Sequence, residues 1–282
     1  MIILQSIILG IIQGITEFFP ISSSGHLVVF PFIFRWDYLP LYFTVTVHFG
    51  TLIAILAVFY KDIYNIMKSF AMVLFCPKNR DRDSLMLGLF IIIGSIPAAI
   101  AGFFIADVAD MLFSSPIMVA IFLLLTALLL WSGEAIARRR PKSNPQHAPK
   151  ISGTGLNYTK ALVIGLGQAL AVFPGVSRSG STISFGRYMG MDRKQSVRFS
   201  FLLSVPVIFG SFVFEIYREW AVIIEGGKDT AVFLGLGFIF SLVAGIFAIK
   251  FMLKLVERRS LNIFAVYCVC LSVLLFILYF VT

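Results

Sequence analysis

The chain has 282 residues, of which 59% are hydrophobic and only 13% are charged, against about 25% charged residues in an average soluble protein. Too few charged side chains remain to cover a soluble globule, so the composition excludes a soluble enzyme, a disordered chain and a fibrous repeat and indicates a multi-pass membrane protein. The net charge of +9 comes from basic residues in a few loops, which suits anionic lipid head groups and predicts no nucleic-acid partner.

The first predicted element, residues 1–34, is apolar but is interrupted by Glu17, Pro20 and the run S-S-S-G-H over residues 22–26. Each half is shorter than the roughly 20 residues that a membrane-spanning helix needs. Helix-breaking polar backbone at membrane depth is tolerated only inside protein or beside water. We therefore predict a re-entrant helical hairpin with a polar tip.

Six further stretches are long and apolar enough to span a membrane. In chain order they are residues 38–60, 84–106, 111–133, 199–214 with its ends extended to 196–217, 230–249 and 260–282. His48 is a lone histidine in the first of these spans, and we interpret it as structural.

A second interrupted region, residues 161–190, lies between the third and fourth spans. It contains P-G at 174–175 and S-R-S-G at 177–180, which predict a second re-entrant hairpin. The fold class that follows is all-α: a polytopic membrane protein with six full transmembrane helices and two re-entrant helical hairpins.

Basic residues are concentrated in the loops at 61–82, 138–160 and 250–259, whereas the loop near 107–110 carries only acidic residues. The positive-inside rule places the three basic loops in the cytoplasm. If the hairpins do not cross the membrane, both termini lie outside. The polar stretch 141–157 is the one linker-like segment, and it divides the chain nearly in half.

An internal repeat appears when the sequence is shifted by 155 residues, which places residues 13–25 on residues 168–180. Five of the thirteen positions then match: Gln13/Gln168, Phe18/Phe173, Ser22/Ser177, Ser24/Ser179 and Gly25/Gly180. We predict one integral membrane domain, residues 1–282, with repeats at about 1–134 and 158–282. Each half then has one hairpin and three spans. Because three is an odd number of membrane crossings, the second half is inverted relative to the first, as in secondary transporters.

The two hairpin tips contain most of the polar residues predicted at membrane depth. Glu17 and Arg178 are the clearest functional candidates, because ionisable residues inside a membrane are costly, and they can partly neutralise each other. Arginine presents a planar donor fork that matches phosphate oxygens, and Ser23 with His26 supplies a nucleophile and a base. Close helix packing explains the serine and glycine runs equally well when each tip is taken alone.

At these residues the chain resembles the undecaprenyl-diphosphate phosphatase, or bacitracin-resistance, family. The matching motifs are Q-G-I-T-E-F-F-P-I-S-S-S-G-H at 13–26, P-G-V-S-R-S-G-S-T at 174–182 and F-S-F-L-L-S-V-P at 199–206. The resemblance extends over the whole chain in length, motif order and apolar spacing.

This resemblance implies an enzyme that hydrolyses undecaprenyl diphosphate to undecaprenyl phosphate and inorganic phosphate. The reaction recycles the lipid carrier of bacterial cell-wall (peptidoglycan) synthesis and confers bacitracin resistance. The family works at the outer, periplasmic face of the bacterial cytoplasmic (inner) membrane with a divalent cation, for which we expect Mg²⁺ or Ca²⁺. The expected partners are the polyprenyl diphosphate, membrane lipids and, as an open alternative to a monomer, a second copy in a homodimer.

The resemblance also assigns roles by motif position. The implied catalytic residues are Glu17, Ser23, His26 and Arg178; the implied substrate-binding residues are Ser22, Ser24, Ser177, Ser179 and Thr182; the implied metal ligands are Glu17 and Gln13. Many family members have Glu where this chain has Gln13, so a site with two carboxylates is not expected here.

Two alternatives stay open at this point. The nucleophile is either Ser23 or an activated water. The inverted repeat and broken helices also suit a transporter or lipid flippase, which would move its anion without releasing phosphate. A membrane scaffold is a third class, and it predicts that Arg178→Ala is harmless to any activity.

Overall fold

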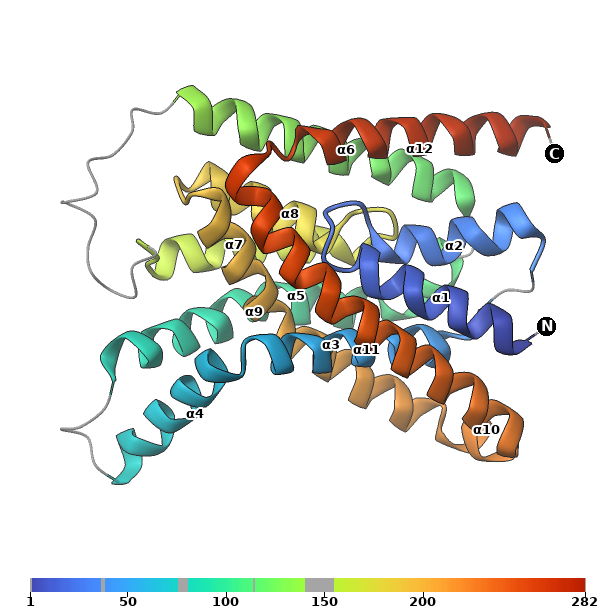
Figure 1. Cartoon of the computed structure of the whole chain (residues 1–282), viewed down its shortest axis with the longest axis horizontal. Helices are drawn as coiled ribbons and strands as arrows, with labels where there is room; N and C mark the ends of the chain where they lie inside the picture. The colour runs from blue at the N-terminus through green and yellow to red at the C-terminus, as the bar shows by residue number, and fades with distance from the viewer. Residues whose placement is uncertain (1, 37–38, 76–80, 114, 140–154, 282) are drawn as a thin grey trace.

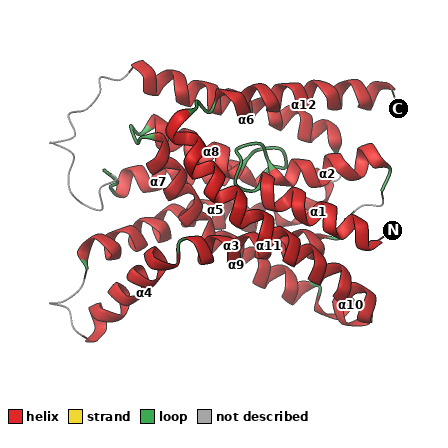
Figure 2. Cartoon of the chain, viewed as in Figure 1, coloured by secondary structure: helices red, strands yellow, loops and turns green. Residues whose placement is uncertain are grey.

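The computed structural model describes residues 2–36, 39–75, 81–113, 115–139 and 155–281, and within these ranges the chain is helical with no strand (Figure 2). The helices are α1 (Ile2–Thr16), α2 (Ser23–Phe34), α3 (Leu41–Val58), α4 (Tyr60–Phe75), α5 (Arg82–Phe113), α6 (Pro116–Arg139), α7 (Tyr158–Ala169), a 3₁₀ turn (Leu170–Val172), α8 (Arg178–Tyr188), α9 (Arg193–Arg218), α10 (Trp220–Glu225), α11 (Gly227–Arg258) and α12 (Asn262–Val281). The all-α prediction is confirmed.

Six of these helices, α3, α5, α6, α9, α11 and α12, are long and apolar enough to cross a membrane, and they match the six predicted spans. Their ends differ from the prediction by several residues; α6, for example, begins at Pro116 rather than at 111 and extends to Arg139. The α5 helix continues to Phe113, so the acidic stretch at 107–110 is helical and the turn comes after it. The α11 helix includes residues 250–258, so this basic stretch forms its last turns rather than a loop. Most of the linker predicted at 141–157 lies outside the described residues.

The basic segment after α3 contains a helix, α4, that the hydropathy pattern did not predict. Ile63, Ile66 and Phe70 recur at helical spacing and pack against the hydrophobic core, while Tyr64 and Met67 are exposed. An amphipathic stripe of this kind is enough to hold a charged helix against the bundle.

Two pairs of short helices turn back on themselves inside the bundle (Figure 1). The α1–α2 pair extends inward from the end of the molecule where both termini lie, and the α7–α8 pair extends inward from the opposite end. The loops that join each pair meet in the middle of the molecule. This is the arrangement expected of two hairpins whose polar tips converge.

Each hairpin is held by a long helix from the other half of the chain. The α1 helix packs on α11, and α7 packs on α5. Gly10 and Gly165 stand at these crossings, where a Cβ atom would collide with the backbone of Gly237 or of Gly94. Small residues at such positions let two helix backbones approach closely, which fixes the depth of each tip.

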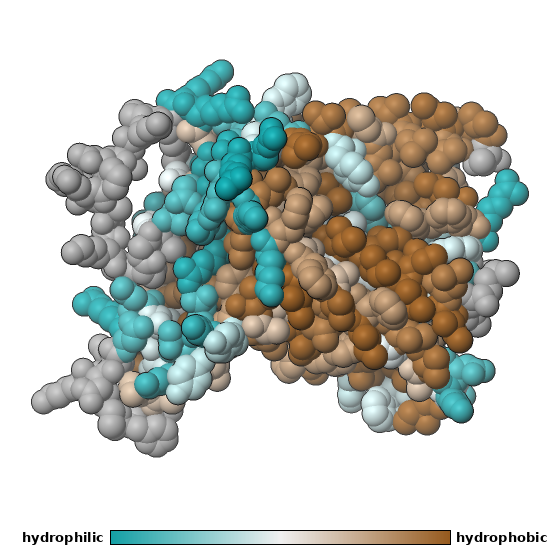
Figure 3. Space-filling model, viewed as in Figure 1, coloured by the Kyte–Doolittle hydropathy of each residue, from teal (hydrophilic) through white to brown (hydrophobic). Residues whose placement is uncertain are grey.

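The surface is divided between polar and apolar regions (Figure 3). On the face shown, hydrophilic side chains gather near the end where α11 passes into α12, and an apolar surface extends from there towards the end that holds both termini. Exposed apolar side chains on α5, α9, α11 and α12 include Phe103, Phe214, Phe247 and Phe280. An extended apolar surface of this kind fits a lipid environment.

Candidate active site

Glu17 and Arg178 form an ion pair where the two hairpin tips meet. Arg178 Nη2 lies 2.5 Å from Glu17 Oε1, and the two side chains are 15% and 5% exposed. Arg178 also donates from Nη1 to the carbonyl of Ser200 on α9, at 3.1 Å. The pairing that the sequence suggested between these two residues is therefore present, although they are 161 positions apart in the chain.

The second carboxylate oxygen of Glu17 is surrounded by three further polar groups. Gln13 donates to Oε2 from Nε2 at 2.8 Å, and the Ser23 hydroxyl donates to it at 2.6 Å. His48 Nε2 lies 3.4 Å from the same oxygen. Glu17 is thus the centre of the site, and it orients the hydroxyl that the sequence analysis named as a nucleophile.

Ser22 and Ser177 build the two tips in the same way. Each is the N-cap of the helix that follows and accepts a hydrogen bond from the backbone N–H three residues on, at Gly25 and Gly180. Ser22 does so with a φ of 68°, a left-handed conformation that is costly for a residue with a Cβ atom and that is often found at functional sites. Because the following residues are Ser23 and Arg178, the caps aim both of these towards Glu17.

The other predicted phosphate-binding hydroxyls have partners within the protein. Ser24 Oγ lies 3.3 Å from Ser22 Oγ. Ser179 donates to the carbonyl of Phe19, which ties the second tip to the first, at 3.2 Å. Thr182 bonds back to the carbonyl of Arg178 and lies 2.6 Å from Ser200 Oγ. Ser179 and Thr182 are buried, so in this structure these hydroxyls hold the position of Arg178.

His26 is buried, and the structure places both of its ring nitrogens on groups other than Ser23. Nδ1 lies 2.7 Å from the carbonyl of Ser22, and Nε2 lies 2.8 Å from the hydroxyl of Tyr267 on α12. The two rings stack at 5.7 Å with an interplanar angle of 8°. The expected contact between Ser23 and His26 is not formed, and sequence reasoning missed Tyr267, which lies 241 residues from His26.

His48 was interpreted as structural, but it is the histidine that lies at the carboxylate. Its Nδ1 is 2.7 Å from the carbonyl of Thr44, one turn earlier in α3. A sequence signal was present: Thr44, Thr46, His48 and Thr51 place polar groups in an otherwise apolar span. Such a run in a membrane helix indicates a face turned towards protein or a cavity.

A divalent cation would find oxygen and nitrogen donors here, although no group of three or more His, Cys, Asp and Glu side chains occurs in the described part of the chain. The donors are the Glu17 carboxylate, the Gln13 amide and His48 Nε2. Gln13 Oε1 is buried and has no hydrogen-bond partner. Carboxylate and amide oxygens are ligands that Mg²⁺ and Ca²⁺ accept, so the residues fit the expected cation.

A groove of about 180 Å³ begins at the first tip. It is lined by Ser24, Leu27, Val28, Pro31, Phe32, Trp36, Leu39, Leu41, Thr44 and Pro116. Ser24 and Thr44 are its polar residues, and both belong to segments that carry site residues. An apolar groove that ends on a polar site suits a ligand with a polar head and an apolar tail.

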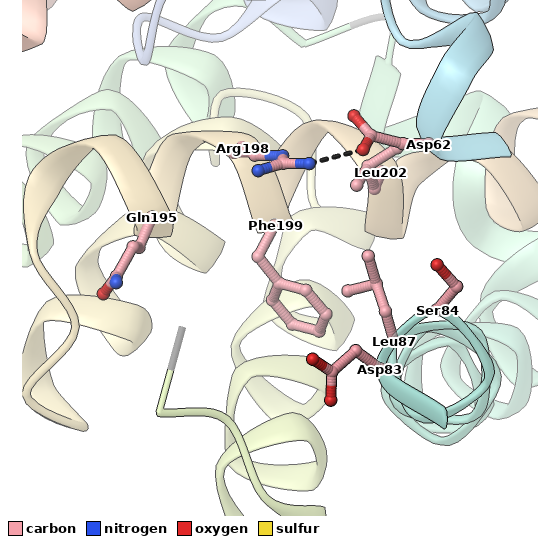
Figure 4. Close-up of a pocket in the computed structure, with 8 residues that line it drawn as sticks. All are labelled: Asp62, Asp83, Ser84, Leu87, Gln195, Arg198, Phe199 and Leu202. Carbon is pink, nitrogen blue, oxygen red and sulfur yellow. Dashed lines mark hydrogen bonds and ion pairs between the residues drawn. The ribbon is translucent and has the colours of Figure 1, made fainter. Parts of the chain in front are cut away.

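A second pocket lies in a different part of the bundle and shares no residue with this site (Figure 4). Its polar lining comes from Asp62 on α4, Asp83 and Ser84 on α5, and Gln195 and Arg198 on α9. Arg198 donates to Asp62. The arginine is therefore already neutralised. Nearby Asp81 accepts hydrogen bonds from the Ser84 hydroxyl and from two backbone N–H groups, and the Ser84 bond holds the pKa of Asp81 below its usual value. This pocket has the character of a helix-end network rather than of an anion site.

Comparison with known proteins shows which family this sequence resembles. A family model described as bacitracin resistance protein BacA matches residues 6–274. A protein of Thermodesulfovibrio yellowstonii named undecaprenyl-diphosphatase is 40% identical over 278 residues, covering 98% of this chain and 97% of that protein. Proteins with the same name from Korarchaeum cryptofilum and Methanosphaera stadtmanae are each 37% identical, over 274 and 285 residues, covering 96% and 98% of this chain and 97% and 98% of their own.

Proposed function

Because the chain belongs to the bacitracin resistance protein BacA family, we propose that it is an integral membrane phosphatase that hydrolyses undecaprenyl diphosphate to undecaprenyl phosphate and inorganic phosphate. The observation that carries this proposal within the molecule is the meeting of Arg178, Glu17 and Ser23 at the two tips. A largely buried guanidinium beside an oriented hydroxyl suits the transfer of a phosphoryl group.

Arg178 binds the diphosphate. Its fork donates to Glu17 and to the Ser200 carbonyl in this structure, which holds it in one orientation and leaves further N–H groups for phosphate oxygens. In the transition state the same groups stabilise the charge on the equatorial oxygens. Ser22, Ser24, Ser177, Ser179 and Thr182 support this geometry through the caps and contacts described above.

Ser23 attacks the terminal phosphorus. The new Oγ–P bond forms as the bond from phosphorus to the bridging oxygen breaks, and undecaprenyl phosphate leaves. Glu17 orients the attacking hydroxyl, and we propose that the hydroxyl proton passes to Nε2 of His26, three residues on in α2, once this ring parts from Tyr267. Water then hydrolyses the phosphoserine and releases inorganic phosphate. The hydrogen bond from Ser23 to Glu17 favours the serine over a directly attacking water.

A divalent cation, Mg²⁺ or Ca²⁺, would supply charge neutralisation of the diphosphate when bound. Glu17 and Gln13 would hold it. Since Gln13 is uncharged and Arg178 already neutralises Glu17, the negative charge for the cation comes mainly from the substrate. We therefore expect the cation to bind together with the diphosphate rather than before it.

The prenyl tail follows the apolar groove that begins at Ser24. The groove is large enough for the first isoprene units only, and the rest of the tail lies in lipid. Val28→Trp would fill the groove. We expect this variant to raise the KM for undecaprenyl diphosphate while leaving the hydrolysis of methyl diphosphate, which has no prenyl tail, nearly unchanged; an equal effect on both substrates would contradict this path.

The remaining features of the proposal concern placement in the cell. We propose that the two hairpins are re-entrant, that the halves at about 1–134 and 158–282 are inverted, and that the site opens to the periplasmic face of a bacterial inner membrane. The opposite entry of the two helix pairs and the positions of the basic segments support this arrangement. In spheroplasts, an impermeant thiol reagent should label Arg35→Cys and not Asp83→Cys in a cysteine-free background.

A homodimer is likewise proposed from the family, and the mass of the purified protein in lipid nanodiscs tests it.

The rival function is transport of the same lipid, which uses the same inverted architecture. Purified protein in detergent separates the two, because a transporter releases no phosphate. We expect phosphate release from undecaprenyl diphosphate, its loss with a chelator, and a phosphoserine that can be trapped at Ser23 in wild type and is absent from Ser23→Ala. Lipid flipping in liposomes without phosphate release would overturn the proposal.

A further inference from the structure

His48 lies at the edge of the proposed cation site without a role in the mechanism above. We propose that His48 is a third protein ligand of the divalent cation and binds it through Nε2. This inference rests on the proposed phosphatase function, because it concerns the cation of that same site. His48 lies outside the three sequence motifs that carry the family resemblance. The inference starts instead from its position, with Nε2 3.4 Å from Glu17 Oε2.

The hydrogen bond on the other side of the ring determines which nitrogen is available. Nδ1 lies 2.7 Å from the carbonyl of Thr44. A carbonyl oxygen can only accept, so Nδ1 carries the hydrogen, and in the neutral imidazole the lone pair falls on Nε2. Metal-bound histidines almost always donate their second ring N–H in this way, to a carbonyl or a carboxylate. His48 therefore has the tautomer and the orientation of a ligand.

Gln13 provides the second, independent observation. Its side chain is fully buried, its Nε2 donates to Glu17, and its Oε1 has no partner. A buried amide oxygen without a hydrogen bond is costly. With the amide turned so that Oε1 rather than Nε2 faces Glu17, a cation beside the carboxylate would relieve this cost and would complete a set of one carboxylate, one amide oxygen and one imidazole.

The other histidine of the site does not compete for this role. Both nitrogens of His26 are engaged, with the Ser22 carbonyl and with the Tyr267 hydroxyl. His26 is consequently a control for His48: it lies in the same region, is more deeply buried than the 23% exposed His48 side chain, and should not touch the cation.

An imidazole ligand changes which cation the site prefers. Oxygen-only sites suit Mg²⁺ and Ca²⁺, whereas first-row transition ions accept nitrogen more readily. In the presence of a diphosphate, we expect the protein to bind Mn²⁺ at least about tenfold more tightly than Ca²⁺, and His48→Gln to reduce this ratio, because it removes the nitrogen donor.

Pulsed electron paramagnetic resonance on the whole protein tests the proposal directly. The probe is Mn²⁺ with methylenediphosphonate, a diphosphate that cannot be hydrolysed. In wild type and in His26→Gln, we expect ³¹P coupling from the diphosphonate and ¹⁴N coupling from an imidazole. In His48→Gln, the ³¹P coupling should remain and the ¹⁴N coupling should disappear.

Either of two results would overturn the proposal: ¹⁴N coupling that survives in His48→Gln, or wild type with ³¹P coupling and no ¹⁴N coupling. If His48→Gln does not fold, the His26→Gln variant is labelled with ¹⁵N-histidine instead. We then expect ¹⁵N coupling from His48, and bound Mn²⁺ without ¹⁵N coupling would contradict the proposal. Phosphate release by the same wild-type preparation distinguishes failure of the phosphatase function from failure of the His48 proposal, because release without imidazole coupling refutes only the role of His48.

Discussion

At the scale of single residues, the site depends on which groups surround one buried carboxylate. Glu17 accepts from Arg178, Gln13 and Ser23 and lies beside His48. The sequence alone indicated that Glu17 and Arg178 are functional, because charge at membrane depth is rarely tolerated otherwise. His48 was interpreted as structural, since a lone histidine in an apolar span usually is, although the threonines around it in α3 were a signal to the contrary. The sequence did not reveal that His26 turns to Tyr267, because that contact depends on how α12 packs against α2.

The shape of the Arg178 side chain leads to the first prediction. Arg178→Lys keeps the positive charge opposite Glu17 but loses the planar fork. We expect phosphate release to fall by about 100-fold, with little change in the thermal unfolding midpoint in detergent. Arg193→Lys, at a buried ion pair away from the site, is the control and should retain activity; equal losses in both variants would mean that Arg178 acts through stability alone.

At the scale of helices, the two hairpins are supported in parallel ways. On one side, Thr126 of α6 donates to the carbonyl of Gly175 and accepts from the N–H of Ser177. On the other, the Cys268 thiol of α12 lies 3.8 Å from the carbonyl of Pro20, which the 155-residue shift aligns with Gly175. The spans were predictable from hydropathy. The two contacts that hold the tips, which we call the Thr126 clamp and the Cys268 clamp, were not predictable, because they join residues about 50 and 250 positions apart.

The Thr126 clamp yields the second prediction. Thr126→Val keeps the shape of the side chain and leaves a buried N–H and a buried C=O without partners, which costs about 1–3 kcal/mol of folding free energy. We expect a lower unfolding midpoint and a lower kcat, because the tip that carries Arg178 loosens. Thr126→Ser restores the hydroxyl and should recover both; a fully active, stable Thr126→Val would remove the clamp from the account.

At the scale of the whole molecule, polar clusters occupy distinct depths in an apolar bundle. Away from the tips, the carboxylate of Glu134 on α6 is fully buried and binds Arg193 of α9, with Nε and Nη2 at 2.8 and 2.5 Å, and Ser260 before α12 at 3.1 Å. This network joins helices from both halves of the chain. The composition predicted the apolar surface and the number of spans, but not this second buried pair, since Glu134 and Arg193 lie 59 positions apart in the chain.

Stability should therefore depend on Glu134 more than on exposed pairs. Glu134→Gln leaves Arg193 and Arg187 without their carboxylate, and breaking a buried pair costs about 3–5 kcal/mol. We expect a clear drop in the unfolding midpoint. Glu257→Gln removes an exposed partner of Lys194 and should leave the midpoint unchanged. A midpoint equally insensitive to both changes would contradict the structural role of the Glu134 network.

The most direct test of the central claim compares two buried glutamates that each bind an arginine. Phosphate release from undecaprenyl diphosphate is measured for wild type, Glu17→Gln and Glu134→Gln, at a temperature where circular dichroism shows all three folded. The account predicts that Glu17→Gln loses at least about 100-fold in kcat/KM and that Glu134→Gln stays within a few-fold of wild type. Full activity in Glu17→Gln would contradict the placement of the phosphatase site at the meeting of the two tips.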